Sequence, residues 1–278
     1  MGLREEIDTL AAGNQWGAVV QREEEIVAAG DAVALWQLGR AAMRQSDMAL
    51  AIFALRRALE GEGPATDLGG KVLIDLAVSF SRCGDGNSSD RILQMYLANF
   101  ERYSHGLMQL GAVYYSLGYN AEERSDFELA LQHFRQAERA WRQWADRKQR
   151  AELAAAETLR SGLRPLEARA ALETLSAELL PENRGLYLQT LAGMYRDQGD
   201  LERARETALD AARELAAKDE HGTNVLTLGF VYLLLGEIHA DLGASAAARM
   251  YATLAEAAGR SSTRLYLTDQ ARHLLRRL

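Results

Sequence analysis

The stretch LQTLAGMYRDQGDLERARETALDA, residues 188–211, decides the fold class. Its first half carries large apolar residues at helical spacing, Gly199 and Asp200 interrupt the pattern, and alanines then recur at helical spacing. Ala204 follows Ala192 by twelve positions. The stretch therefore predicts two antiparallel helices joined by a tight turn, with Gly199 closing the first helix and Asp200 as the N-cap of the second.

The same spacing recurs elsewhere in the chain. Twelve positions also separate Gly39 from Ala51 and Gly236 from Ala248. A small residue in the middle of the first helix and an alanine early in the second allow two helix backbones to approach closely. Glycines are expected to end first helices in the left-handed conformation at four places, Gly84, Gly118, Gly199 and Gly243.

At these residues the sequence resembles the tetratricopeptide repeat (TPR) family, whose units are helix-turn-helix pairs of roughly 34 residues. The family pattern matches Leu35, Leu38, Gly39, Ala51, Leu55 and Ala58, and again Leu107, Leu110, Gly111, Tyr114, Gly118, Ala130, Phe134 and Ala137. Weaker copies are Leu73, Leu76, Ala77, Phe80, Gly84 and Leu93, and Ala155, Ala156, Leu159, Ala168, Leu172 and Leu175. The resemblance implies an all-α, right-handed α-solenoid of about six to seven repeats with a C-terminal capping helix.

We expect one solenoid domain, 1–278, with repeat units at 1–29, 32–63, 70–103, 104–147, 149–181, 185–219 and 229–259. The segment 261–278 is expected to be the capping helix, with Ser261 or Ser262 as its N-cap.

Two departures from the pattern carry their own expectations. The distance from Gly111 to Ala130 is nineteen instead of twelve, which predicts about two extra helical turns around 120–127 in a unit that projects beyond its neighbours. No glycine or proline occurs from Phe127 to Arg150, which is consistent with one long helix that bends near 144–148.

The composition limits the class of partner and the environment. The 278 residues carry a formal net charge of −7, with 3 prolines, 23 glycines and a single cysteine, Cys83. We therefore expect no nonspecific nucleic-acid binding and no internal disulfide. The acidic amino terminus and the lack of a long apolar run indicate a cytoplasmic protein without a membrane segment.

The search for catalytic or metal-binding motifs finds none. The histidines include no pair at metal-ligand spacing, and neither a phosphate-binding loop nor a nucleophile elbow is present. The stretch from Asp85 to Asp90 fails as a calcium loop because Asp90 stands where glycine is required, and it is interpreted as a capping turn with Ser88 or Ser89 as N-cap. We expect no metal, no cofactor and no enzymatic activity.

The TPR resemblance implies a concave groove lined by the first helix of each unit. Carried over position by position, the groove residues are Trp36, Arg40, Met43, Arg44, Lys71, Arg82, Met108, Tyr115, Arg150, Arg160, Gln189 and Arg196, with His105 beside them. This set is basic over most of its length, and Glu237 and Asp241 make the carboxyl end acidic. The lysine and asparagine clamp that the family uses for a C-terminal carboxylate is absent.

Two interpretations of the groove arginines stay open: they bind an acidic segment of another protein, or they form salt bridges between neighbouring repeats. Trp141 and Trp144 likewise form either a homodimer face or, as we favour, part of the core. The function expected from these observations is a scaffold or adaptor that binds another protein or peptide. The alternative is a peptide-sensing regulator that acts through a partner.

Overall fold

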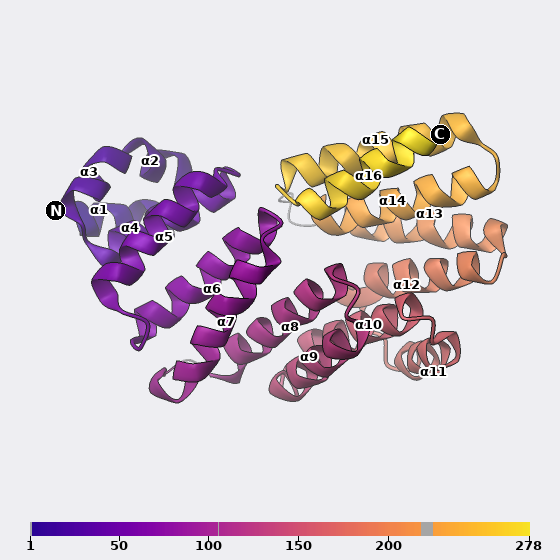
Figure 1. The fold of residues 1–278 in the computed structure, drawn as a ribbon, viewed down its shortest axis with the longest axis horizontal. Helices are drawn as coiled ribbons and strands as arrows, with labels where there is room; N and C mark the ends of the chain where they lie inside the picture. The colour runs from indigo at the N-terminus through magenta and orange to yellow at the C-terminus, as the bar shows by residue number, and fades with distance from the viewer. Residues whose placement is uncertain (1, 105, 218–224) are drawn as a thin grey trace. The chain divides into compact units, whose positions relative to one another are not determined.

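The computed structural model describes residues 2–104, 106–217 and 225–278, and these residues form 16 α-helices and two short 3-10 helices. The chain divides into two compact units, 1–113 and 114–278, which are described separately. Within each unit, successive helices form antiparallel pairs (Figure 1). The predicted all-helical class is therefore confirmed, whereas the expected repeat boundaries and the single domain stay predictions.

Unit 1 begins with three short helices and continues with two helix pairs. Its helices are α1 (Leu3–Ala12), α2 (Trp16–Gln21), α3 (Glu23–Ala29), α4 (Ala32–Arg44), α5 (Met48–Glu62), α6 (Asp67–Arg82), α7 (Gly86–Asn99) and η1 (Phe100–Arg102). Buried aliphatic side chains from α4, α5 and α6 meet residues of the opening helices in one core. The short opening helices thus cover the apolar side of the first full pair.

Helix α8 (Leu107–Glu123) crosses the boundary between the units, and the remaining helices belong to unit 2. They are α9 (Phe127–Ala140), α10 (Ala145–Ser161), α11 (Pro165–Ser176), η2 (Pro181–Asn183), α12 (Arg184–Asp197), α13 (Leu201–Ala217), α14 (Val225–Asp241), α15 (Ser245–Ser261) and α16 (Leu265–Arg277). Helix α16 packs on both α14 and α15 and presents a polar outer side, which agrees with its predicted capping role (Figure 1).

Gly118 does not end a helix, and that expectation is wrong. Gly118 lies inside α8, where an added Cβ atom would be 2.6 Å from Cε1 of Phe134. Gly39 meets Leu55 in the same way, also at 2.6 Å and also sixteen positions away. Gly118, and not Gly111, therefore takes the central small position, and the turn of this pair is at Ser125, with a φ of 61°.

The corrected register removes the expected insertion around 120–127. Ala130 follows Gly118 by the usual twelve positions, and α8 has 17 residues, as do α10 and α14. The helix pair α8–α9 therefore contains no extra helical turns. The other three glycines, Gly84, Gly199 and Gly243, are confirmed as turn residues with φ of 77°, 79° and 72°.

The long helix expected to bend near 144–148 is also absent. Helix α9 ends at Ala140, and α10 begins at Ala145. The turn between them is held by Trp141, which is only 2% exposed and packs on Tyr115 with 5.3 Å between ring centroids. A buried aromatic side chain thus anchors a turn that contains neither glycine nor proline, and Trp141 belongs to the core.

Aspartates cap several helices, including one, α7, at which serines were expected. Asp200 accepts a hydrogen bond from the Arg203 amide at 3.3 Å, as predicted for α13. At α7 the cap is Asp85, which accepts from the Ser88 amide at 2.9 Å, so the prediction of a serine cap is wrong. Ser261 and Ser262 do not cap α16 either, because α15 runs through Ser261 and both hydroxyls bond to the Ala258 carbonyl.

The α7 cap gives a direct stability prediction. Asp85→Ala should lower the free energy of unfolding by about 1 kcal/mol, because the amides of the first turn lose their acceptor. Ser88→Ala should cost less, since it removes the hydroxyl that also bonds to Asp85 but keeps the backbone amide. Urea unfolding followed by circular dichroism measures both variants, and an equal loss for the two would contradict the assignment.

Candidate functional site

The residues predicted for the groove lie on the first helices of the pairs. Trp36, Arg40, Met43 and Arg44 are on α4, Lys71 and Arg82 on α6, Met108 and Tyr115 on α8, Arg150 and Arg160 on α10, and Gln189 and Arg196 on α12. His105 lies outside the described residues. First helices of successive pairs contact one another, α4 with α6, α10 with α12 and α12 with α14. We call the side of each unit that these first helices form its inner face.

Unit 1 gathers cations around two indole rings. The guanidinium carbon of Arg40 is 5.0 Å from the ring centroid of Trp36 and 5.3 Å from that of Trp16. Arg44 lies 4.6 Å from the Trp16 ring, and the Lys71 ammonium lies 5.7 Å from the Trp36 ring. These distances are typical of cation–π contacts. We call these five residues the cationic cluster.

The Trp36 ring of the cationic cluster is held by a half-buried carboxyl group. Its Nε1 donates a hydrogen bond to Oδ2 of Asp75 at 2.7 Å. Burial raises the pKa of Asp75, while the hydrogen bond from Trp36 and the charge of Arg40 oppose that rise. Asp75 therefore orients the indole ring that Arg40 and Lys71 contact.

The cations of this cluster carry no ion pair in the part of the chain that the structure describes. Arg40 donates to Gln37 Oε1 at 3.3 Å and acts on Asp75 only through its charge, and no carboxylate comes within ion-pair distance of Arg44 or Lys71. Arg44 and Lys71 are exposed. Three positive charges thus lie together on the inner face of a chain whose net charge is −7.

The other predicted residues of unit 1 have structural contacts. Arg82 donates from Nη1 to the carbonyl oxygen of Met43 at 3.0 Å and so ties α6 to the end of α4. Met43 is half-buried and packs against the unit 1 core. Met108 lies in the first turn of α8.

In unit 2, three predicted residues, Tyr115, Gln189 and Arg150, have packed rings or buried polar atoms. The Tyr115 and Tyr119 hydroxyls are 3.0 Å apart, and both rings contact Phe134. Burial raises the pKa of both tyrosines. Gln189 Oε1 is buried and finds no hydrogen-bond partner among the described residues. The Nε atom of Arg150 is buried in the same way.

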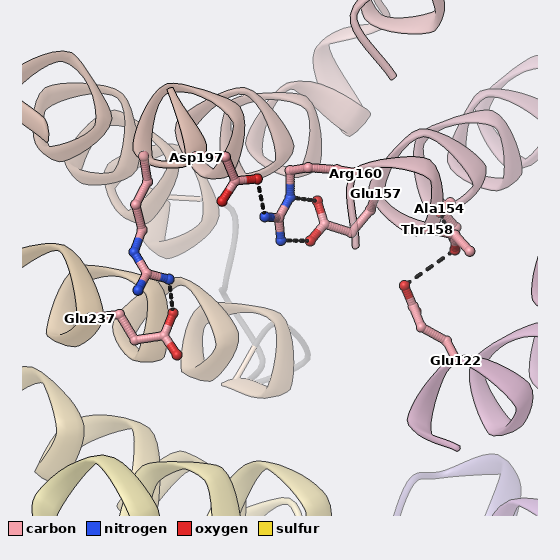
Figure 2. A network of polar contacts seen from close by, with 8 residues as sticks. Glu122, Ala154, Glu157, Thr158, Arg160, Asp197 and Glu237 are labelled. Carbon is pink, nitrogen blue, oxygen red and sulfur yellow. Dashed lines mark hydrogen bonds and ion pairs between the residues drawn. The ribbon is translucent and has the colours of Figure 1, made fainter. Parts of the chain in front are cut away.

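The remaining two arginines follow the salt-bridge interpretation. The Arg160 guanidinium lies between Glu157 and Asp197 (Figure 2). Its nitrogens reach Glu157 Oε1 at 2.6 Å and Asp197 Oδ2 at 2.7 Å. Burial lowers the pKa of Arg160, but the two carboxylates outweigh it and the pKa is raised. Arg196 pairs with Asp241 at 2.7 Å and with Glu237.

Glu122 is the most perturbed carboxyl group of this network. It accepts a hydrogen bond from Thr158 Oγ1 at 3.2 Å (Figure 2). Burial raises the pKa of Glu122 to about 8, and the nearby Glu157 charge adds to the rise, while Thr158 and Arg160 oppose it. Glu122 therefore holds its proton at neutral pH.

The sequence reasoning missed Trp16, Asp75 and Glu122 as site residues, and it missed Arg264, which pairs with Glu123 beside Glu122. Trp16 lies ahead of the first full copy of the repeat pattern, and Glu122 fell within the expected insertion that the structure removes. With Gly118 in the central small position, Glu122 would have been assigned to the same first helix, four residues later, and so to the candidate inner-face residues. Asp75 and Arg264 give no signal in the sequence, because their partners are distant in the chain.

Among the described residues, no group of three His, Cys, Asp or Glu side chains comes together to hold a metal ion. Burial raises the pKa of the Cys83 thiol, which is the opposite of nucleophile activation. No helix in the described ranges is both long enough and apolar enough to cross a membrane.

The antiparallel pairs, central small residues and inner faces define a TPR-like solenoid. No protein-family model and no curated protein matches the sequence. The structure is similar to that of a Rap protein in complex with Competence and Sporulation Factor, with a TM-score of 0.59 and 12% identity over 95% of this chain and 74% of that one. It is also similar to PilF of Pseudomonas aeruginosa, with a TM-score of 0.51 and 18% identity over 83% of this chain and 90% of that one. Both are TPR proteins, so the predicted fold is confirmed.

Proposed function

We propose that the protein is a scaffold or adaptor that holds a segment of another protein on its inner face. The observation that carries this proposal is the cationic cluster of unit 1. Its aromatic rings offer apolar contact area, and its cations have no carboxylate ion-pair partner among the described residues. Rigid aromatic and arginine side chains of this kind are the residues that dominate binding energy at protein interfaces.

Charge complementarity indicates an acidic partner segment for this surface. Guanidinium groups bind carboxylates through paired hydrogen bonds, and Arg40 and Arg44 present two of them beside Trp16. Arg160 and Arg196 contribute less in this proposal, because carboxylates of the chain already occupy them. The partner's anchor is therefore unit 1, with Trp36, Arg40, Arg44 and Lys71 as its main residues.

Fluorescence anisotropy with labelled acidic peptides tests the proposal. The probes are fifteen-residue peptides that combine glutamates with leucines, and matched peptides carry glutamine in place of every glutamate. We expect the wild-type protein to prefer the glutamate peptides, and the double variant Arg40→Glu, Arg44→Glu to bind them at least about tenfold more weakly. The preference should also weaken at high salt.

The matched control reverses two arginines of the second helix α13, Arg203→Glu with Arg213→Glu. Both arginines are exposed, and among the described residues each pairs with an acid three positions earlier, Arg203 with the N-cap Asp200 and Arg213 with Asp210. The control changes net charge by the same amount as the test variant. Equal affinity for both variants, or no preference of the wild type for glutamate peptides, would overturn the proposal.

A peptide-sensing regulator is the second candidate function. It is favoured by the similarity to a Rap protein whose structure was solved with a bound factor, and the likeness covers 95% of this chain. The two functions differ in shape change. A sensor should change its radius of gyration in small-angle scattering when a binding peptide is added, whereas an adaptor should bind the peptide at constant radius.

A further inference from the structure

Contacts between side chains run around unit 2 in a closed circuit. Thr158 of α10 bonds to Glu122 of α8, Arg160 of α10 pairs with Asp197 of α12, and Arg196 of α12 pairs with Glu237 of α14. Helix α14 then packs on α16, where the Phe230 and Tyr266 rings lie 6.4 Å apart. The circuit closes when Arg264, the residue before α16, pairs with Glu123 of α8.

The ion pair between Glu123 and Arg264 joins the two ends of unit 2 along the sequence. Arg264 and Glu123 are 141 residues apart, and Glu123 is the last residue of the first helix in the unit. Their side chains are only 11% and 19% exposed. Such a pair is poorly screened by salt, and the loss of one partner leaves the other charge in a desolvated place. The contact therefore differs in kind from the exposed pairs within single helices of this chain.

The backbone of Thr263, the residue before Arg264, is strained in the turn between α15 and α16. Thr263 has a φ of 54°, and it is the one β-branched residue among the positive-φ residues of the described chain. Other turns between helices place glycine in this conformation, at Gly84, Gly199 and Gly243, or a residue that is not β-branched, at Ser46, Ser125 and Leu163. A β-branched side chain disfavours this conformation, which persists only where surrounding contacts impose it. Contacts of the flanking residues must hold this turn in place.

We propose that the Glu123–Arg264 ion pair is a latch that holds α16 against α8 and keeps the inner face of unit 2 closed. Glu122, Glu123 and Glu237 all interact electrostatically with the Tyr266 side chain, so acids of α8 and α14 face the start of α16. When the latch opens, the start of α16 moves away from α8, and Tyr266 separates from the acids of α8. The latch is independent of the cationic cluster in unit 1.

Spin labels on α9 and α16 test the latch. The labels are placed at Gln132 and Asp269, both exposed, in a background in which Cys83 is replaced by serine. Pulsed electron paramagnetic resonance then gives the distance distribution between α9 and α16. We expect one narrow distribution in the parent protein. Arg264→Gln should shift it to longer distances and broaden it.

Two further variants make the test decisive. The exchange of charges, Glu123→Arg with Arg264→Glu, should restore a distribution closer to the parent than Arg264→Gln gives. The control Arg260→Gln removes a neighbouring arginine whose partner Glu256 lies on its own helix, and it should leave the distribution unchanged. If Arg264→Gln does not fold by circular dichroism, Glu123→Gln takes its place. An unchanged distribution in a folded single variant, or an exchange variant no closer to the parent, overturns the proposal.

Discussion

Gly118→Val should lower the free energy of unfolding by about 3 kcal/mol, one of the largest single-residue effects in this chain. A Cβ atom at position 118 would be 2.6 Å from Cε1 and 2.8 Å from Cδ1 and Cζ of Phe134. Phe134 is fully buried, so its ring has no free space into which to move. The clash must therefore separate α8 from α9 or force the ring into a strained rotamer. Urea unfolding monitored by circular dichroism measures the loss.

Two further variants identify the Phe134 contact as the cause. Gly61→Ala makes a comparable change in α5, where the new Cβ atom meets only the Ala32 Cβ at 3.8 Å, and it should stabilise the protein by up to about 1 kcal/mol through helix propensity. The double variant Gly118→Val, Phe134→Ala should cost less than the sum of its single changes. Additive losses would show that Gly118 does not pack on Phe134.

Glu122→Gln should remove a pH dependence of stability that the wild type shows. The pKa of Glu122 is raised to about 8 in the folded protein from an ordinary value of 4.5, chiefly by burial and then by Glu157. The folded state therefore binds more protons than the unfolded state between these values. The stabilising contribution is complete below about pH 4.5, falls as the pH rises through 8, and does not change further above that.

The variant should match the wild type near pH 5 and exceed its stability by about 2–4 kcal/mol at pH 9, since glutamine carries no charge to bury. Urea unfolding at a series of pH values measures the difference. Glu167→Gln is the matched control, because hydrogen bonds from Arg164 lower the pKa of Glu167 and its stabilising effect is lost as the pH falls. Parallel pH profiles for wild type and Glu122→Gln would show that Glu122 ionises freely in the folded protein.

The helix pairs and most of their turns could be predicted because they depend on residues close in sequence. A glycine between two apolar helical stripes indicates a left-handed turn, and this held for Gly84, Gly199 and Gly243. Gly118 shows where such reasoning ends. Glycine satisfies either a positive φ or a close approach of two helices, and only the position of Phe134 distinguishes the two roles.

The sequence could predict which residues lie on the inner face, but not which of them already have partners within the chain. The TPR resemblance places Arg40 and Arg160 at comparable sites on first helices. Arg40 lies between two indole rings, whereas Arg160 is held by Glu157 and by Asp197, which is 37 residues away. The first arginine is free for a partner in our proposal, and the second is an internal contact. No local sequence pattern distinguishes Arg40 from Arg160, because the partners of each arginine depend on which helix packs beside it.

The sequence by itself determined that the chain is a series of helix pairs, because spacing, residue size and turn residues are local properties that recur along it. Tertiary structure alone decided the register of α8 and the turn at Trp141, since both depend on which side chains fill the space between helices. It also decided which charges meet, including Glu123 and Arg264 across 141 residues. Ion pairs depend on distance in space, and helix packing sets that distance.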